Sequence, residues 1–157
     1  MIKTMYFIVT VILMSAVFFF SSCALINIFS NNSTYPPPSN NKNYVILADY
    51  GLMVMKKDMA KSTWSSACDM CKQLRLEGFS DWRLPTQGEL AILYNERNVI
   101  GGFDTFNNIQ YWSSTPYGAG GFYVCQNFTT GKMGYHLDMF NQQPLAFRCV
   151  RNISPLR

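Results

Sequence analysis

The stretch Phe79-Ser80-Asp81-Trp82-Arg83-Leu84-Pro85-Thr86 decides the fold of this chain. It combines a tryptophan and an Asp/Arg pair with a proline directly before a helix start, which suits a tight, partly buried corner. Thr86-Gln87-Gly88-Glu89 then has the form of a capping box, in which the threonine accepts from a first-turn amide and the glutamate reaches back. Asp81, Trp82 and Arg83 could form a binding triad. We instead expect Trp82 to fill the core, Arg83 to tie loop backbone to a carboxylate, and Pro85 to be structural.

This stretch has matching neighbours along the chain. They are Gly51-Leu52-Met53, a helix with Trp64, Ala67, Cys71 and Leu74, the pair Glu89-Leu90, Tyr111-Trp112-Ser113-Ser114 and Arg148-Cys149-Val150-Arg151. From about Val45 to Arg151 the sequence resembles the Lcl C-terminal domain family, bacterial surface domains that are grouped with the C-type-lectin-like fold. The resemblance implies an α+β domain with two short helices packed on a small antiparallel sheet and loop-rich C-terminal strands.

The first 22 residues are predicted to be a secretory signal peptide and not part of the fold. Lys3 supplies the positive charge, an apolar run of 16 residues follows from Met5 to Phe20, and Ser21-Ser22-Cys23 resembles a lipoprotein lipobox. Cleavage before Cys23 would leave its thiol to carry the lipid. A single transmembrane anchor is the alternative, but the run is shorter than the roughly 20 residues a spanning helix needs. We therefore expect an exported protein, lipid-anchored to the bacterial cell envelope at the outer membrane.

The remainder is long enough for one domain with a core but not for two. We expect a tether over residues 23–43, rich in Asn and Ser and stiffened by Pro36-Pro37-Pro38, a domain over 44–152, and a tail over 153–157. Removing Lys3 from the 13 basic residues leaves 12 against 9 acidic residues, and they form no basic run. The pattern is unlike that of a nucleic-acid binder.

Four cysteines follow Cys23, namely Cys68, Cys71, Cys125 and Cys149. An even number in an exported chain favours disulfides, with a redox pair, a metal site and free thiols as alternatives. A zinc site would prefer a second close pair, and a redox Cys-x-x-Cys normally sits at a helix N-terminus. The family resemblance implies a Cys71–Cys149 bridge. Cys68, one turn earlier on the same helix face, is then expected to pair with Cys125.

Turn residues and periodicity predict the order of the elements. Two short strands flank Asp49-Tyr50-Gly51, and a helix runs from a cap at Ser62 or Thr63 to about Leu76, where Gly78 ends it. A second helix covers Gln87 to Asn95. Strands are expected over Gln110–Ser114, Gly121–Phe128, Met133–Asp138 and Leu145–Asn152, with a hairpin turn at Thr129–Lys132 and a core role for Trp112. Two helices followed by antiparallel strands indicate an α+β fold.

Nothing in the sequence favours catalysis or a cofactor. His136 is the single histidine, so a Ser-His-Asp or Cys-His site would have to use it. Calcium-dependent sugar binding is also not expected, because Gln142-Gln143-Pro144-Leu145 lacks an acid after the proline and no Trp-Asn-Asp motif exists. Asp138 alone cannot supply the several oxygens that calcium needs. We expect neither a metal nor another cofactor.

The last third of the chain is rich in Tyr, Asn and Gln, which recur at recognition surfaces. The residues that we expect to bind a ligand are Tyr117, Tyr135, His136, Asp138, Phe140, Asn141 and Gln142. The predicted function is adhesion to an extracellular polysaccharide or a surface protein, without chemistry. The alternative is a structural subunit of an envelope or pilus complex. The resemblance also extends to lectin-like targets of diversity-generating retroelements, whose variable residues lie in this C-terminal region.

Overall fold

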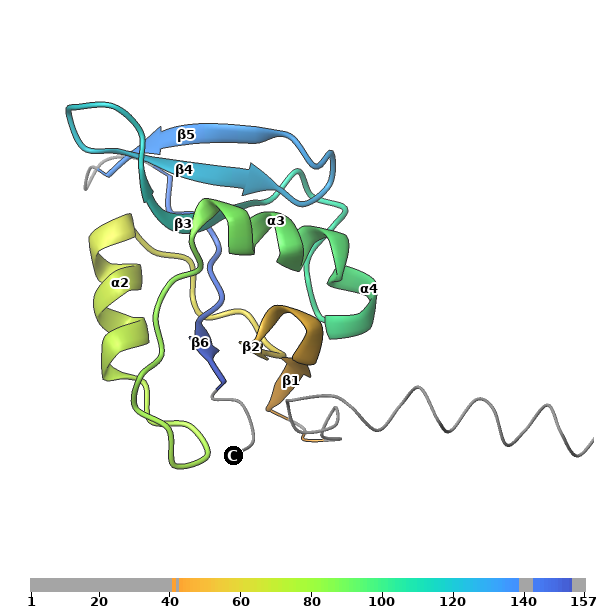
Figure 1. Cartoon of the computed structure of the whole chain (residues 1–157). Helices are drawn as coiled ribbons and strands as arrows, with labels where there is room; N and C mark the ends of the chain where they lie inside the picture. The colour runs from red at the N-terminus through yellow and green to blue at the C-terminus, as the bar shows by residue number, and fades with distance from the viewer. Residues whose placement is uncertain (1–40, 42, 139–142, 154–157) are drawn as a thin grey trace, which may run out of the picture. The chain divides into compact units, whose positions relative to one another are not determined.

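The computed structural model describes residues 41, 43–138 and 143–153 of the chain (Figure 1). Its elements, in chain order, are β1 (Tyr44–Leu47), the short 3-10 helix η1 (Ala48–Tyr50), β2 (Leu52–Met55), α2 (Trp64–Gln73), α3 (Gln87–Asn95), α4 (Arg97–Ile100), β3 (Gln110–Pro116), β4 (Phe122–Asn127), β5 (Met133–Leu137) and β6 (Val150–Asn152). The predicted signal peptide, lipidation site and most of the tether lie outside the described residues. No helix in the described part of the chain is long and apolar enough to cross a bilayer.

The strands form two three-stranded antiparallel sheets, in the orders β1-β2-β6 and β3-β4-β5. Helices and antiparallel sheets in one domain confirm the predicted α+β class. The expectation of one small sheet is wrong, because β6 pairs with β2 and not with the other C-terminal strands. In Figure 1, α3 lies between the β3-β4-β5 sheet and the strands β1 and β2.

The first sheet is buried on both faces. Ile46 and Met53 pack in one core cluster with Ala67 and Cys71 of α2. Val45, Leu47, Leu52 and Val54 point to the other side and pack with Leu90 and Leu93 of α3. This double burial explains why β2, Leu-Met-Val-Met, reads as a continuous apolar run and does not alternate with polar residues.

The corner at Trp82 has the structural role that the sequence predicts. Trp82 is 2% exposed, and the backbone of Arg83 pairs with Val150 of β6 in both directions, with N···O distances of 2.9 and 2.8 Å. The Arg83 guanidinium donates to both carboxylate oxygens of Glu89 at 2.7 Å. Glu89 completes the predicted capping box with Thr86, and α3 covers the predicted range. The carbonyl of buried Pro85 accepts from Ser114 of β3 at 2.7 Å, so this corner joins both sheets to α3.

The helix α2 begins as predicted but ends earlier. The Thr63 side chain accepts from the Ser66 amide, and the helix stops at Gln73 because Leu74 is extended. Gly78 does not end the helix. It adopts a φ of 80° in the turn that pairs Leu76 with Phe79, so its conformational freedom serves the loop after α2.

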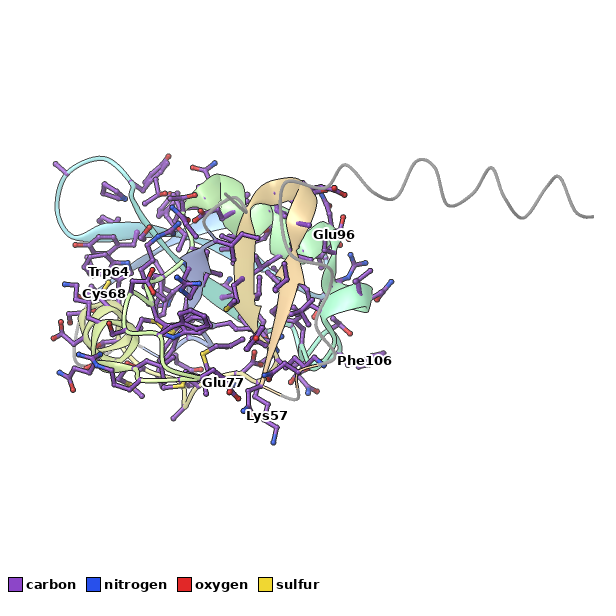
Figure 2. The ribbon with its side chains drawn as sticks, turned by 60° about the horizontal axis from the view of Figure 1, so that its bottom comes forward. Lys57, Trp64, Cys68, Glu77, Glu96 and Phe106 are labelled. Carbon is purple, nitrogen blue, oxygen red and sulfur yellow. A yellow bond between two sulfur atoms is a disulfide. The ribbon has the colours of Figure 1, made fainter. Side chains whose placement is uncertain are left out.

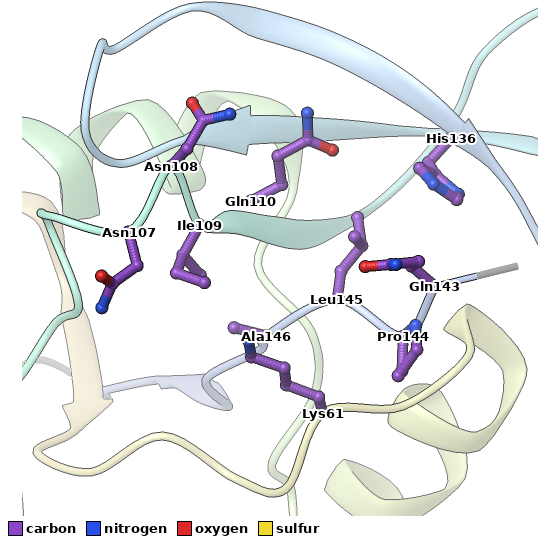
Figure 3. Close-up of a pocket in the computed structure, with 10 residues that line it drawn as sticks. All are labelled: Lys61, Asn107, Asn108, Ile109, Gln110, His136, Gln143, Pro144, Leu145 and Ala146. Carbon is purple, nitrogen blue, oxygen red and sulfur yellow. The ribbon is translucent and has the colours of Figure 1, made fainter.

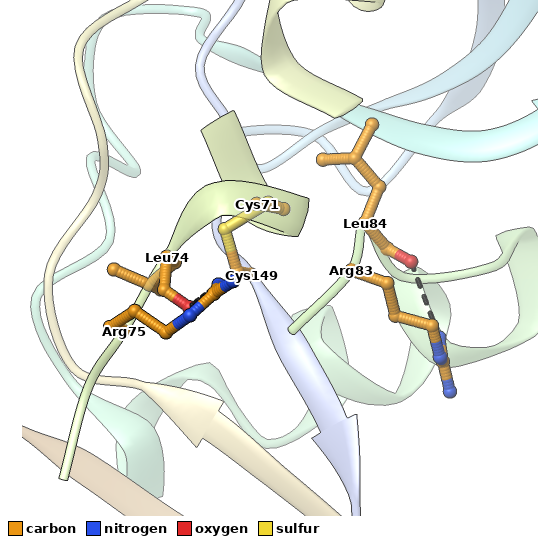
Figure 4. The surroundings of a disulfide bond; sticks show 6 residues. All are labelled: Cys71, Leu74, Arg75, Arg83, Leu84 and Cys149. Carbon is orange, nitrogen blue, oxygen red and sulfur yellow. Dashed lines mark hydrogen bonds between the residues drawn. A yellow bond between two sulfur atoms is a disulfide. The ribbon is translucent and has the colours of Figure 1, made fainter. Parts of the chain in front are cut away.

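The disulfide Cys71–Cys149 is formed and fastens α2 to the segment before β6 (Figure 4). It closes a loop with a sequence separation of 78 residues. In the chain-entropy model a loop of this size contributes roughly 4–5 kcal/mol to the free energy of unfolding. Beside it, Arg75 donates to the carbonyls of Lys72 and Leu74 at the end of α2. This disulfide confirms the pairing that the family resemblance implied.

Candidate functional site

A depression of about 440 Å³ opens where β3, β5 and the chain before β6 meet (Figure 3). Its lining residues are Lys61, Asn107, Asn108, Ile109, Gln110, His136, Gln143, Pro144, Leu145 and Ala146. Four of these ten residues are amides, two carry a basic nitrogen and none is acidic. The volume lies in the range of small-molecule sites, and each amide offers both donors and acceptors. The depression is suited to a ligand with many hydroxyl groups.

The floor of the depression is built by the chain that passes from the second sheet to the first. Ala146 pairs with β3 through its backbone, accepting from Trp112 at 3.0 Å and donating to Gln110 at 3.1 Å. Leu145 pairs with Ser62 in the same manner. The predicted strand Leu145–Asn152 is therefore too long, because only Val150–Asn152 forms β6 while the earlier part crosses between the sheets.

The wall that contains Asn107 and Asn108 is held by turn geometry. The Asp104 carboxylate accepts from the Asn107 backbone amide at 3.2 Å and from its side-chain amide at 2.7 Å. Asn108 adopts a φ of 54°, and its Oδ1 accepts from Asn127 at 2.6 Å. Asn tolerates this left-handed conformation better than most residues, which explains its use at this position.

Buried Arg148 anchors the start of the same loop. It is 1% exposed, donates to the carbonyls of Gly101 and Gly102 at 2.8 Å, and donates from Nε to Asp58 at 2.8 Å. Its guanidinium carbon lies 3.4 Å from the centroid of the Phe103 ring. Burial lowers the pKa of Arg148, and the attraction of Asp58 offsets part of this effect. Such a buried cation is stable only when it is paired, so these contacts fix the loop.

Tyr111 links the Asp58 end of this network to the loop. Its hydroxyl donates to Asp58 Oδ2 at 2.6 Å and accepts from the Asp104 amide at 3.0 Å. Burial raises the pKa of Tyr111, and the hydrogen bond to Asp58 raises it further. The phenol therefore stays protonated and acts as a fixed donor in this network.

Two of the predicted binding residues lie on the side of β5 that faces the depression. His136 lines it and contacts the buried Trp112 edge-to-face, with ring centroids 5.6 Å apart. The contact supports the predicted core role of Trp112, which is 1% exposed. Asp138 comes two residues later, and its carboxylate accepts from the Ser65 amide in the first turn of α2 at 3.2 Å. A carboxylate at this position complements the helix dipole, so Asp138 stabilises α2.

The two predicted tyrosines lie on the opposite side of the sheet. Successive residues of a strand point to opposite faces, so Tyr135 and His136 diverge. Tyr135 stacks on Tyr117 with the ring centroids 4.2 Å apart, and the edge of Phe122 meets Tyr135. Both tyrosines are about half exposed. Phe140, Asn141 and Gln142 lie outside the described residues, so the structure places the other four candidates on two separate faces.

The second predicted disulfide is wrong, because Cys68 and Cys125 are free thiols. Cys125 is buried on β4 with its sulfur 3.5 Å from Gln110 Oε1, whereas Cys68 is half-buried on α2. Burial raises the pKa of each thiol to about 11. Both therefore remain protonated at neutral pH and pack as small apolar groups.

Most of the polar residues that line the depression were not predicted from the sequence. Lys61, Asn107, Asn108, Gln110 and Gln143 come from segments that are far apart in the chain. The pair Asn107-Asn108 before a predicted strand was the available indication, because adjacent asparagines favour a turn with exposed amides. Among the described residues, no group of three or more His, Cys, Asp and Glu side chains is arranged to hold a metal.

Comparison with known proteins identifies the domain. The family model described as the Lcl C-terminal domain matches residues 30–151, which is most of the chain. The chain belongs to the Lcl C-terminal domain family. No curated protein matches it. In this Lcl C-terminal domain the Trp82 corner and the Cys71–Cys149 disulfide form the frame.

Proposed function

We propose that this protein is a lipid-anchored surface module, C-type-lectin-like in fold, that binds an extracellular polysaccharide without catalysis. The observation that carries the proposal is the depression lined by amides, Lys61 and His136. Its lining residues supply neutral donors and acceptors together with apolar Leu145 and Pro144. Sugars require this combination, because their hydroxyl groups need hydrogen bonds while their ring faces need apolar contact.

The hydrogen bonds within the wall leave several polar groups available to a ligand. Gln110 uses Oε1 for the Cys125 thiol, so its amide nitrogen can still donate. No ion pair joins Lys61 to another residue that the structure describes. Gln143 is exposed at the rim. Binding at these groups adds hydrogen bonds without breaking those that hold the loop.

A glycan and surface-protein array probed with the full chain tests this proposal. The double variant Gln110→Ala/Gln143→Ala should lower the affinity for a captured polysaccharide about tenfold, since each lost hydrogen bond is worth roughly 0.5–1.5 kcal/mol. Gln87→Ala is the matched control, because Gln87 lies beside Tyr117 and Tyr135 on the other face of the sheet. Equal affinity of the double variant and the parent for every captured ligand would contradict the assignment of the site.

An assembly role is the second candidate, and the tyrosine face supports it. Tyr117, Met133 and Tyr135 are partly exposed and line a space of about 280 Å³, and Phe122 contacts Tyr135. An envelope or pilus subunit would bury such side chains against a neighbour. If Tyr117→Ala/Tyr135→Ala removes capture of a surface protein while Gln110→Ala/Gln143→Ala does not, this second function replaces the first.

The anchor is tested separately. Cys23→Ser should leave an uncleaved or mislocalised precursor that no longer labels with palmitate. A variant that labels and fractionates like the parent would exclude lipidation at Cys23.

A further inference from the structure

Phe106 is the most exposed large hydrophobic residue in the described part of the chain, with 90% of its surface open to solvent. It lies in the loop between α4 and β3, and in Figure 2 it projects from the right side of the molecule while Lys57 extends from the bottom. One exposed apolar residue alone is ordinary in a soluble domain. Two further features of this loop give it significance.

First, the loop fixes the outward position of the ring. Asp104 Oδ1 accepts from the Phe106 amide at 3.1 Å and from the Asn107 amide at 3.2 Å. Tyr111 and Arg148 hold the loop from inside, through the Asp104 amide and the carbonyls of Gly101 and Gly102. The exposure of Phe106 is therefore built into the fold.

Second, lysines gather beside this loop. The segment after β2 carries Lys56, Lys57 and Lys61. This segment packs closely against Gly102 at the start of the Phe106 loop. A Cβ atom added to Gly102 would lie only 2.6 Å from the Lys56 carbonyl oxygen. Hydrogen bonds from Asn107 and the Phe106 amide lower the pKa of Asp104, and the charge of Lys61 lowers it further.

The nearby carboxylates only partly cancel these lysines. Asp58 is paired with Arg148, whereas Asp104 and Glu77 keep their negative charges because they accept only from neutral amides. Glu77 accepts from Asn43, whose carbonyl in turn accepts from the Lys56 amide. Three lysines against the two carboxylates Asp104 and Glu77 leave a small net positive charge beside Phe106.

We propose that Phe106 and the lysines Lys56, Lys57 and Lys61 form a contact site for an anionic lipid surface. An aromatic side chain that enters the interface beside lysines that attract lipid headgroups is a common way of binding a membrane. A protein partner fits less well, because protein hot spots lie in well-packed pockets surrounded by contacts that exclude water. The loop neighbours of Phe106 are Asp104, Thr105, Asn107 and Asn108, and no other exposed large hydrophobic residue of the described chain lies in this loop. This site goes beyond the proposed function because it orients the domain on a membrane.

Tryptophan fluorescence of the full chain tests the site. The variant Phe106→Trp is mixed with vesicles of two parts phosphatidylcholine and one part phosphatidylglycerol, and the signal of the parent, with Trp64, Trp82 and Trp112, is subtracted. We expect emission at shorter wavelength and quenching by brominated acyl chains. Tyr135→Trp is the matched control, because Tyr135 is a half-exposed aromatic residue on a strand without lysine. It should keep its emission wavelength and remain open to aqueous iodide.

Charge reversal tests the lysines. Lys57→Glu in the Phe106→Trp background should lower the quenching by brominated lipid at least twofold, and vesicles of phosphatidylcholine alone should do the same. Neither Phe106 nor Lys57 lines the depression, so polysaccharide binding should not change. The proposal is overturned if position 106 stays open to iodide with the anionic vesicles, if Tyr135→Trp is quenched equally, or if Lys57→Glu has no effect.

Discussion

The corner at Trp82 and the rim of the depression both carry polar side chains but differ in how those polar groups are used. At the corner, Arg83 donates to Glu89, to the Leu84 carbonyl and to Asn152, and Asp81 pairs with Arg151. At the rim, Lys61 has no ion pair with another described residue, and Gln110 keeps donors for a ligand. At the corner the polar groups bind to each other and stabilise the fold, whereas at the rim some remain available to a ligand. A polar residue is thus better judged by its partners than by its type.

The largest expected effect is at the corner. Trp82→Ala should lower the free energy of unfolding by about 3–5 kcal/mol, because it leaves a large cavity beside the Cys71–Cys149 disulfide. Denaturant unfolding measures the loss. The indole nitrogen of Trp82 has no hydrogen-bonding partner among the described residues, so the loss is one of packing. Trp64→Ala is a control on a half-buried ring and should cost clearly less. A Trp82→Ala variant as stable as the parent would contradict the core role.

Arg148 holds the loop that leads to Asn107 and Asn108, and its replacement should affect both stability and the depression. Arg148→Ala leaves the partly buried carboxylate of Asp58 without its partner, and breaking a buried pair costs about 3 kcal/mol. It also releases Gly101 and Gly102, so polysaccharide affinity at the depression should fall as well. Arg151→Ala is the matched control, because its partner Asp81 is largely exposed and such pairs are worth at most about 1 kcal/mol. Equal effects of the two substitutions, measured by thermal unfolding and glycan binding, would contradict this role.

Much of the frame was predictable from local rules. The capping box at Thr86 sets the start of α3 from four residues, and the family pattern supplied the Cys71–Cys149 pair. Pairing between distant segments was not predictable. Nothing local indicates that β6 pairs with β2, or that Asp58 meets Arg148, 90 residues later. The depression depends on both facts, so its residues could not be named from composition.

The binding face was predicted from composition, and composition does not encode the register of a strand. Tyr135 and His136 are adjacent, yet their side chains point to opposite faces because the period of a strand is two residues. Only the pairing of His136 with Tyr123, and the stack of Tyr123 on Trp64, reveals which side meets α2. The predicted binding residues are similar in type, but those that the structure describes do not form one site.

The pH dependence of stability tests the Arg83–Glu89 ion pair at the corner. Burial raises the pKa of Glu89, but the hydrogen bonds from Arg83 and Thr86 outweigh burial and leave it below its usual value of 4.5. A carboxyl whose pKa is lower in the folded state than in the unfolded state stabilises the folded protein at a pH above its unfolded-state pKa. This contribution is lost as the pH falls through the folded-state pKa. Glu89→Gln should therefore be less stable than the parent at pH 7, and the difference should shrink below about pH 4.5. A difference independent of pH would exclude the ion pair as its cause.

The smallest expected effect concerns the two free thiols. Cys68 is half-buried and forms no disulfide, so Cys68→Ser should change the free energy of unfolding by less than about 0.5 kcal/mol. Cys71→Ser is the control and should lose most of the roughly 4–5 kcal/mol of the disulfide. Because the pKa of both Cys68 and Cys125 is about 11, alkylation at pH 7 should be slow in the folded protein and fast after denaturation. Peptide mapping without reductant should find one crosslink, Cys71–Cys149. A Cys68–Cys125 crosslink would contradict the assignment of these two residues as free thiols.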